Sequence, residues 1–495
     1  MKKYSKSLAS LMAGITFVDP DIDYLIQGLS IDSRQTQLGD LFFAYPGEKV
    51  DGRDFIKEAI EKGAIAILAE EDSSVAYPWP TLPINIVLIK LNDVQHRIGQ
   101  IAARFYDYPS RHIHITGVTG TNGKTSIAYL LAYAFNALHH KSVYFGTLGI
   151  GSPEKLQEST HTTLDPIHLQ HSLSLFSQKG ITHAALEVSS HALDQGRVAH
   201  IEFETAIFTN LTRDHLDYHK TMEAYGEAKA KLFKQFGLKS AVINQDDPFG
   251  INLYNSLSDN IFRLGYSLKD PNAEIYADEI SMTREGTHAN IKTPWGEKHF
   301  KTPLIGNFNL YNILAIIGVL GLSFPLDEVL TCIETLPNVP GRLECITSST
   351  HPLCIVDYAH TPDALKNVLI TSKELLKSTK GKLWCVFGCG GNRDKGKRPE
   401  MGKIAETFAD YVVITNDNPR TENPESIAND IIQGLSSQKN VSVILDRQKA
   451  ITHAFNHAQL DDIILIAGKG HEPYQIIGTE KHFFSDQAVC KALVS

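Results

Sequence analysis

The central part of the chain alternates short apolar runs with longer segments of helical spacing. The apolar runs at 184–188, 205–211 and 241–243 each end in a polar loop, and helix-like stretches separate them. This alternation is typical of βαβ units and predicts a parallel sheet. Because ligands bind beyond the carboxyl ends of the strands in such sheets, we expect a site in the polar residues that follow these runs.

The start of the chain predicts a smaller α/β unit. Apolar runs at 41–45 and 64–69 predict strands, and the spacing at 54–62 predicts a helix between them. The moderately apolar stretch 8–18 is broken by polar residues and followed by aspartates, so we expect a short helix and not a signal peptide. Periodicity stops at 106–110, which contains a proline and predicts a linker.

The rest of the chain predicts a meander, a helix and a further α/β unit. Residues 273–301 have the pattern of β-strands, and 306–322 that of a helix. The apolar runs that follow predict strands, each ending in a polar motif, at 354–356, 383–387, 412–415 and 463–466.

The length of 495 residues is too great for one core and suggests about three domains. We predict an α/β protein with a small N-terminal α/β domain (1–108), a central parallel-sheet domain (109–339) and a C-terminal Rossmann-like domain (340–495). Apolar content of 42% and charged content of 21% fit a soluble globular enzyme.

Charge and cysteine usage narrow the possible partners. The net charge of −9 argues against nucleic acid, although local Lys and Arg still permit an anionic substrate. No run approaches the roughly 20 apolar residues of a membrane span, so no membrane insertion is expected. The six cysteines form no C-x-x-C pair, which favours reduced thiols in a cytoplasmic protein.

A glycine-rich loop follows the predicted strand 112–115. Gly117, Gly120 and Gly123 precede Lys124, and a helix is expected from there to residue 138. Strand, glycine loop, Lys-Thr and helix form a phosphate site: backbone N–H groups face the anion, the lysine neutralises phosphates and the Thr hydroxyl binds magnesium. Five residues separate the outer glycines where the usual pattern has four. An ordinary βα turn is therefore the alternative.

Two charged residues near this loop have plain structural alternatives. Glu187 ends a predicted strand, where a carboxylate could hold magnesium or could simply cap a helix. Lys229 lies in a helical stretch and, on the residues alone, is expected to be solvated.

Polar motifs follow the strands of the third domain at 357–362, 388–393, 417–420 and 468–472. The second is not a dinucleotide fingerprint, because Arg393 occupies the place of the third glycine. The Asn-Pro pair at 418–419 could be only a turn signal. So many strand-end motifs in one domain are nonetheless difficult to explain as loops alone.

Residues 120–125, Gly-Thr-Asn-Gly-Lys-Thr, closely resemble the ATP loop of the Mur ligase family, which includes the folylpolyglutamate synthetases. Further motifs resemble the muramoyl-tripeptide synthetases of this family: Asp-Ser-Arg (32–34), Gly-Asp-Leu-Phe (39–42), Asp-Gly (51–52), Glu-Val-Ser-Ser-His-Ala-Leu (187–193), the polar run 209–219 and the helix 225–233.

The resemblance implies an ATP site with magnesium. Catalytic roles fall on Lys124, Lys229, His215 and Arg342. The metal ligands implied are Thr125, Glu187, His215 and Lys229, the last as N6-carboxylysine. The ATP-binding residues implied are Gly120, Thr121, Asn122, Gly123, Lys124, Thr125, Ser126, Asn312, Arg342 and Asp357.

It also implies two further substrate sites. A uridine-nucleotide substrate would contact Ile31, Ser33, Glu48, Lys49, Val50, His161, Thr162, Thr163, Ser189, Gln195 and Arg197. Diaminopimelate would contact Arg393, Asp417, Asn418, Pro419, Arg420, Gly468 and Glu472. Diaminopimelate differs from lysine by one distal carboxylate, which an arginine pairs bidentately.

The implied activity is ATP-driven amide formation, through an acyl phosphate, between UDP-N-acetylmuramoyl-L-alanyl-D-glutamate and meso-diaminopimelate in cytoplasmic peptidoglycan precursor synthesis. All partners would be small molecules, and the chain is expected to be a monomer. Two alternatives are a folate-type polyglutamate synthetase and a P-loop ATPase that switches partner binding. The uridine-type motifs and the Asp-Asn-Pro-Arg motif argue against the first, and polar groups clustered as for a small substrate argue against the second.

Overall fold

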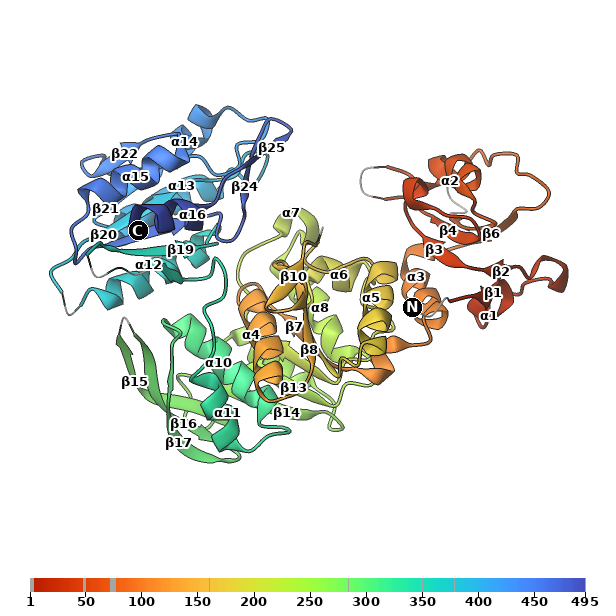
Figure 1. The fold of residues 1–495 in the computed structure, drawn as a ribbon, viewed down its shortest axis with the longest axis horizontal. Helices are drawn as coiled ribbons and strands as arrows, with labels where there is room; N and C mark the ends of the chain where they lie inside the picture. Colours follow the sequence, from red (N-terminus) through yellow and green to blue (C-terminus); the bar gives the residue numbers. More distant parts are fainter. Residues whose placement is uncertain are drawn as a thin grey trace.

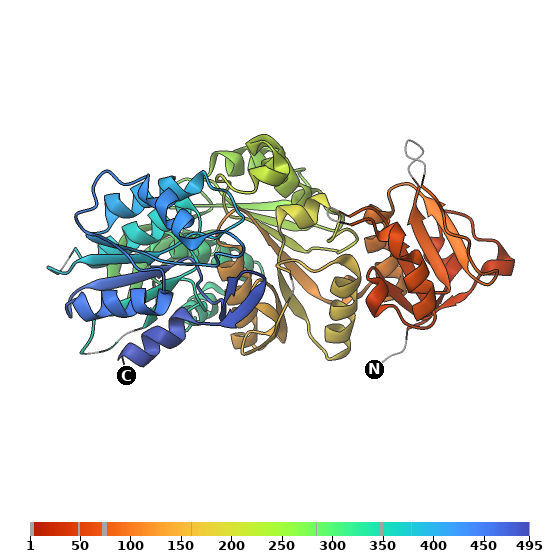
Figure 2. The ribbon, with the colours of Figure 1, turned by 90° about the horizontal axis from the view of Figure 1, so that it is seen from above.

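The structure is a computed structural model that describes residues 4–47, 50–71, 77–159, 161–283, 285–346, 348, 350–377 and 379–494. Three domains follow one another in a row, with the N-terminal domain at one end and the C-terminal domain at the other (Figures 1 and 2). None of the helices described is both long enough and apolar enough to span a membrane.

The N-terminal domain contains a parallel sheet of order β3-β4-β5-β6. Strand β4 is buried along its whole length: Leu41 and Phe43 pack in one core with α1 and α3, whereas Phe42 and Ala44 pack in another with α2. A strand covered on both faces is a continuous apolar run, as the sequence pattern indicated. Its elements are β1 (Lys6–Ser7), α1 (Leu8–Met12), η1 (Pro20–Ile22), β2 (Leu25–Ile26), β3 (Gly28–Ser30), η2 (Ser33–Gln35), β4 (Asp40–Ala44), η3 (Gly52–Phe55), α2 (Ile56–Lys62), β5 (Ala66–Glu70), β6 (Val87–Leu91) and α3 (Val94–Phe105).

The central domain has a large mixed sheet of order β10-β9-β8-β11-β7-β12-β13-β14-β15-β16-β17. The run from β8 to β15 is parallel, and the antiparallel meander β15-β16-β17 forms one end. Its strands are β7 (His114–Thr119), β8 (Ser142–Gly146), β9 (Gly149–Ser152), β10 (Lys155–Gln157), β11 (His183–Glu187), β12 (Thr205–Phe208), β13 (Ser240–Asn244), β14 (Phe262–Ser267), β15 (Ile275–Thr283), β16 (Gly286–Thr293) and β17 (Gly296–Thr302).

Helices cover both faces of this sheet. One core packs α4, α10 and α11 against it, and another packs α5 and α9 on the other side. The predicted strand at 112–115 begins only at His114, because His112 ends a 3-10 helix that starts at Pro109. The helices are η4 (Pro109–His112), α4 (Lys124–Ala137), α5 (Pro166–Gln178), α6 (Ser190–Asp194), α7 (Leu216–His219), α8 (Met222–Ala230), η5 (Lys231–Lys234), α9 (Pro248–Ser256), α10 (Asn307–Leu320) and α11 (Leu326–Ile333).

The C-terminal domain has a sheet of order β18-β19-β23-β20-β21-β22, parallel except at β18. Helices α12, α13 and α14 pack on one face, and α15 and α16 pack on the other. Its elements are β18 (Glu344–Ile346), β19 (Leu353–Asp357), α12 (Pro362–Leu375), β20 (Leu383–Phe387), α13 (Lys397–Phe408), β21 (Tyr411–Ile414), α14 (Pro424–Ile432), β22 (Val441–Val443), α15 (Arg447–His457), β23 (Ile463–Ala467), β24 (Tyr474–Ile477), β25 (Glu480–Phe483) and α16 (Asp486–Val494).

Helix starts in both larger domains carry a local sequence signal. Asp165, Asp247, Thr361 and Asn423 each precede a proline, and each side chain accepts a hydrogen bond from a backbone N–H of the first turn. Such a cap satisfies an otherwise unpaired donor, while proline at the first helical position loses no hydrogen bond. The cap and the proline therefore fix the residue at which each of these helices begins.

Candidate active site

The loop after β7 lies at the carboxyl edge of the central sheet, between two neighbouring strand ends. Strand β7 pairs with β11 on one side and β12 on the other, so that Glu187 lies opposite Val118 and Phe208 opposite Thr119. The topology thus brings the glycine loop, Glu187 and the polar segment after β12 together, as the alternating pattern predicted.

The glycines of this loop permit close packing. A Cβ at Gly120 would lie 1.8 Å from Thr209 Oγ1, and one at Gly123 would lie 2.7 Å from Asn312 Oδ1; both glycines have positive φ. Asn122 N donates to Asn210 Oδ1 at 2.9 Å. Gly123 precedes α4 without a side-chain cap, so the first-turn N–H groups of α4 are suited to bind an anion.

Lys124 is held against the loop that precedes it. Its Nζ donates to the carbonyls of Gly120 and Thr121, each at 2.8 Å. Burial lowers the pKa of Lys124, while Glu187 and Asp214 act in the opposite direction. The lysine thus lies beside the anion-binding helix start, as the motif predicts.

Glu187 is buried and fully engaged. It accepts hydrogen bonds from Thr125 Oγ1 at 3.0 Å, from the backbone N–H of Thr147 at 2.9 Å and from the hydroxyl of Tyr144. The cap of the following helix is instead Ser189, so the alternative interpretation of Glu187 as a helix cap is wrong. Tyr144 and Thr147 were not expected from the sequence.

Lys229 is only 1% exposed, so the expectation of a solvated helix lysine is wrong. Helix α8 places it against the glycine loop: its Nζ donates to Gly120 O at 2.8 Å and lies 4.2 Å from the Tyr225 ring centroid. Burial and the neighbouring Lys124 lower the pKa of Lys229 well below its usual value. A larger share of neutral amine is what reaction with carbon dioxide requires.

His215 lies next to this lysine, in the segment after β12. It precedes α7 with a φ of 54°, and its ring lies edge-on to Tyr225 with centroids 6.0 Å apart. Burial lowers the pKa of His215 to about 4, against the opposing effect of Asp214. The imidazole is therefore neutral at pH 7, the form that can bind a metal.

Arg342 connects the C-terminal domain to this site. Its Nη2 donates to Thr125 Oγ1 at 3.3 Å, and its guanidinium carbon lies 4.5 Å from the Tyr358 ring centroid. Its Nε has no partner among the described residues although it is buried. Asp357 accepts N–H bonds from Leu343 and Ala359 at 2.6 and 2.7 Å, and burial raises its pKa.

A cavity of about 650 Å³ lies between the central and C-terminal domains at this point. Of the residues predicted to bind ATP or metal, it is lined by Thr121, Asn122, Gly123, Lys124, Thr125, Ser126, Glu187, His215, Lys229, Asn312, Arg342 and Asp357; Gly120 lies beneath them.

Another part of the cavity wall was missed by sequence reasoning. Asp246, Lys269 and Tyr311 also line it. Asp246 accepts hydrogen bonds from Tyr311 Oη and Ser267 Oγ, both at 2.6 Å, and from Leu268 N at 2.8 Å. The polar run that follows the predicted strand at 241–243 was the available signal.

The uridine-nucleotide set is divided between two places. Thr162 and Ser189 line the cavity. Thr163 Oγ1 donates to Glu187 O at 2.9 Å, and Arg197 donates to Thr163 O at 3.3 Å and to Gln195 Oε1 at 2.8 Å. His161 lies in the same loop. The others, Ile31, Ser33 and Val50, lie in the N-terminal domain, where Ser33 Oγ donates to Glu58 Oε2 at 2.7 Å; Glu48 and Lys49 lie outside the described residues.

The predicted diaminopimelate residues meet at adjacent strand ends of the C-terminal sheet, in the order β23-β20-β21. Asn418 Nδ2 donates to Glu472 Oε2 at 2.9 Å, while Asn418 Oδ1 accepts from Lys469 Nζ at 3.2 Å and Ile476 N at 2.9 Å. Arg420 has a φ of 53° and donates to Gly391 O at 2.9 Å.

The remaining members of this set have different surroundings. Pro419 is buried against Gly391, Gly468 has a φ of 114° beside Asp417, and Arg393 is exposed. None of the set lines the 650 Å³ cavity.

The donor set near the glycine loop fits magnesium. Magnesium usually binds one or two carboxylates beside substrate phosphates and keeps several waters. Thr125 Oγ1 and the Glu187 carboxylate already lie 3.0 Å apart at the loop. Among the described residues no group of three His, Cys, Asp or Glu side chains is close enough to hold a metal alone.

Known proteins match each part of the chain. Residues 25–106, 118–320 and 341–470 match the Mur ligase family catalytic domain, the Mur ligase middle domain and the Mur ligase glutamate ligase domain, respectively. The chain belongs to the Mur ligase family. Members of this family are ATP-dependent ligases that form amide bonds.

The individual relatives span nearly the whole chain. A UDP-N-acetylmuramoyl-L-alanyl-D-glutamate–2,6-diaminopimelate ligase of Coxiella burnetii is 46% identical over 94% of both chains. A solved structure of a ligase with that name is 36% identical and covers 99% of both chains, with a TM-score of 0.71. A Mycobacterium tuberculosis folylpolyglutamate synthase shares the fold over 75% of this chain and 92% of its own, at 18% identity and a TM-score of 0.62.

Proposed function

We propose that the protein joins meso-2,6-diaminopimelate to the D-glutamate of UDP-N-acetylmuramoyl-L-alanyl-D-glutamate with ATP. The observation that carries the proposal is the 46% identity, across 94% of the chain, to a ligase named for this reaction. The product would be a peptidoglycan precursor, made in the cytoplasm by a monomer with domains at 1–108, 109–339 and 340–495.

The first step would be phosphoryl transfer to a carboxylate. The D-glutamate side-chain carboxylate attacks the γ-phosphate of ATP, the bond to ADP breaks and an acyl phosphate forms. Both reactants are anions, so the step needs fixed positive charge. Lys124 and Arg342 would provide it; the position of Lys124 at the start of α4 and the contact of Arg342 with Thr125 support this proposal. Magnesium held by Thr125 and Glu187 would supply further positive charge at the phosphates.

The second step would be amide formation. The amine of diaminopimelate attacks the acyl carbon, and a tetrahedral intermediate forms. Phosphate then leaves with the electron pair of its C–O bond, and the amine loses a proton. One cavity is lined by both the central and the C-terminal domain, and it would hold the acyl phosphate out of bulk water. The amine would enter from the amino-acid loops, which do not line the cavity.

Lys229 would act as a carbamate. The ammonium form first loses a proton; the neutral amine then adds to carbon dioxide and releases a second proton, so that a buried cation becomes an anion. That change suits the site, since Lys229 lies beside Lys124 and burial disfavours its ammonium form. With His215 it would complete the ligand set for magnesium, which lacks a third fixed group among the described side chains.

The amino-acid pocket would use the loops at the ends of β20, β21 and β23. Arg420 would pair with the distal carboxylate of diaminopimelate, and Asn418 and Glu472 would meet its amino-acid end together with Arg393. The mutual hydrogen bond of Asn418 and Glu472 supports this arrangement, because it places an amide and a carboxylate side by side. The uridine nucleotide would extend from the 161–163 loop to Ser33 in the N-terminal domain.

The test is phosphate release with the muramoyl dipeptide nucleotide and one amino acid at a time. We expect release from ATP with meso-diaminopimelate and at least roughly a hundredfold lower kcat/KM with L-lysine, as loss of a fully desolvated charge pair costs several kcal/mol. Equal use of the two amino acids would contradict the pocket assignment. ATP hydrolysis that needs no acceptor would contradict the ligase proposal and favour a switch-type ATPase.

A further inference from the structure

Two arginines, Arg398 and Arg447, are the largest fully buried side chains among the described residues. Arg398 lies in the first turn of α13, within a run that also contains Lys395 and Lys397. Its side chain is 0% exposed, whereas that of Lys395 is 69% exposed. A buried charge is costly unless it is paired and hydrogen-bonded, so the partners of Arg398 define its role.

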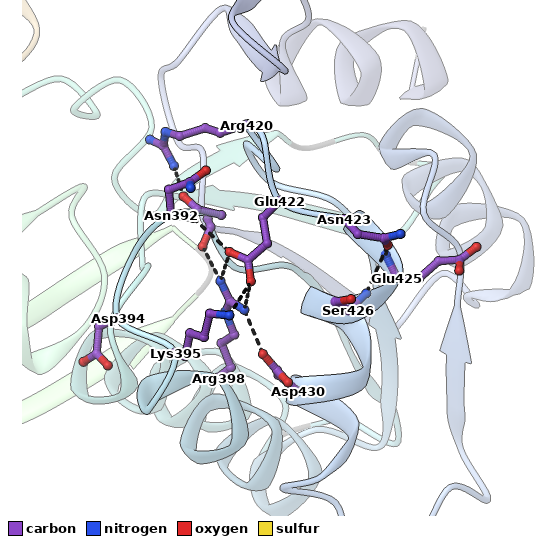
Figure 3. Close-up of polar contacts among 12 residues, drawn as sticks. Asn392, Asp394, Lys395, Arg398, Arg420, Glu422, Asn423, Glu425, Ser426 and Asp430 are labelled. Atoms are coloured by element: carbon purple, nitrogen blue, oxygen red, sulfur yellow. Dashed lines mark hydrogen bonds and ion pairs between the residues drawn. The ribbon is translucent and has the colours of Figure 1, made fainter.

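Arg398 joins three segments of the C-terminal domain (Figure 3). Its Nη1 donates to Glu422 Oε1 and Asp430 Oδ2, and its Nη2 donates to Glu422 Oε2, each at 2.8 Å. Nη2 also donates to Gly390 O at 3.2 Å. The fork of Arg398 therefore contacts the loop after β20, the loop after β21 and helix α14 at once.

Glu422 extends this connection to the backbone beside Arg393. Its Oε2 accepts the N–H of Asn392 at 2.9 Å, and Thr421 Oγ1 donates to Asn392 Oδ1 at 3.0 Å. Arg420 reaches back to Gly391 O at 2.9 Å. The two loops are thus joined at several points, and Figure 3 places Arg420 and Asn392 on one side of the Arg398–Glu422 pair.

Both loops have backbone that must be held in place. Asn392 and Arg420 each have a φ of 53°, a conformation that costs free energy for residues with a side chain. Such a conformation persists only where neighbouring contacts over-determine it. Glu422 provides such a contact at Asn392, by accepting its backbone N–H, and Arg398 holds Glu422 in place. The backbone of Arg420 is also held by hydrogen bonds to Ile476 O at 3.0 Å and from Gly478 N at 2.8 Å.

We propose that Arg398 is a positioning residue for amino-acid selection: by holding Glu422, it fixes the two loops that carry Arg393 and Arg420. The inference rests on the proposed function, in which those two arginines bind diaminopimelate. Arg398 does not touch substrate, because its side chain is fully buried. Lysine cannot replace it, since one ammonium cannot make the bidentate pair.

The test compares two amino acids in one assay. In Arg398→Lys, we expect the ratio of kcat/KM for meso-diaminopimelate to that for L-lysine to fall at least roughly tenfold, because displacement of about 1 Å is enough to cost a large factor. The KM for ATP and for the muramoyl nucleotide should stay within about twofold. Glu422→Gln keeps the volume and removes the charge pair, and should lower the ratio in the same way even if Arg398→Lys does not fold.

Two controls separate positioning from stability. Lys395→Met removes the other cation that contacts Glu422, at 3.2 Å, but that cation is exposed, so the ratio should not change. Leu369→Ala, on the buried face of α12, should lower the melting temperature and leave the ratio unchanged. A ratio that is unchanged in both Arg398→Lys and Glu422→Gln, or that falls equally in Leu369→Ala, overturns the inference. A wild type that does not add diaminopimelate would instead overturn the proposed function, and this inference with it.

Discussion

The glycine loop, proposed to bind ATP, and the C-terminal loops proposed to bind the amino acid differ in how the chain builds them. The glycine loop is one continuous segment, 120–123, between β7 and α4, and the backbone at its end and at the start of α4 offers the N–H groups suited to an anion. The proposed amino-acid loops follow three separate strands, which end at Phe387, Ile414 and Ala467. An ion pair of Arg398 with Glu422 and a hydrogen bond from Lys469 to Asn418 hold these loops together. The geometry of the glycine loop thus follows from one stretch of backbone. The geometry of the amino-acid loops depends on buried side chains, such as Arg398, that do not contact the substrate.

The largest effect is expected in the continuous segment. Lys124→Ala should lower kcat by more than about a thousandfold, because the cation proposed to stabilise the transferred phosphoryl group is lost. Lys239→Ala, an exposed lysine of the same domain, is the control and should retain activity. Near-normal ligation by Lys124→Ala at an unchanged melting temperature would refute the role of this loop.

Lys229→Ala should reduce activity by roughly a hundredfold or more, since it removes a predicted ligand of the metal at the phosphates. Added formate or acetate should restore part of the activity if a carbamate is the working group. Lys231→Ala, an exposed lysine two residues further along, serves as the control. An unmodified Lys229 in the mass spectrum of fully active protein would contradict the carbamate.

The contrast between the regions also explains what the sequence predicted. The strand, the loop and α4 followed from a contiguous pattern, and the strand-end motifs of the C-terminal domain were confirmed as neighbours by the order β23-β20-β21. Lys229 was expected to be solvated because its burial comes from α8 packing on Gly120, a contact across 109 residues. Arg398 lies in a basic run that looks exposed. Only the three-dimensional structure shows that Arg398 is buried while Lys395 is exposed.

Arg420→Ala tests the assembled region directly. The KM for meso-diaminopimelate should rise more than about tenfold, because loss of a charge-assisted pair in a closed site costs about 2–5 kcal/mol. The KM values for ATP and for the muramoyl nucleotide should change little. Lys449→Ala, an exposed cation of the same domain, is the matched control. If Arg420→Ala is silent, the distal carboxylate binds elsewhere.

The smallest effect is expected in a part of the cavity wall that is formed by segments distant from each other in the sequence. Tyr311 and Asp246 come from α10 and from the segment after β13, and a 2.6 Å hydrogen bond joins them in the wall of the cavity. Tyr311→Phe removes only the hydroxyl donor. Asp246 keeps its bonds from Ser267 and Leu268, so the carboxylate stays paired and the loss should be about 1 kcal/mol.

We therefore expect the KM for ATP to rise about fivefold in Tyr311→Phe, with kcat and the KM for diaminopimelate nearly unchanged. Tyr254→Phe is the control. The Tyr254 hydroxyl donates to Glu274 Oε1 at a distance of 2.7 Å, and neither residue lines the cavity. A rise in the ATP KM for Tyr311→Phe alone would mean that nucleotide binding also depends on contacts between distant segments. An unchanged KM would mean that the nucleotide is recognised by the glycine loop and its immediate neighbours alone. The nucleotide site would then depend on one local segment, in contrast to the amino-acid site.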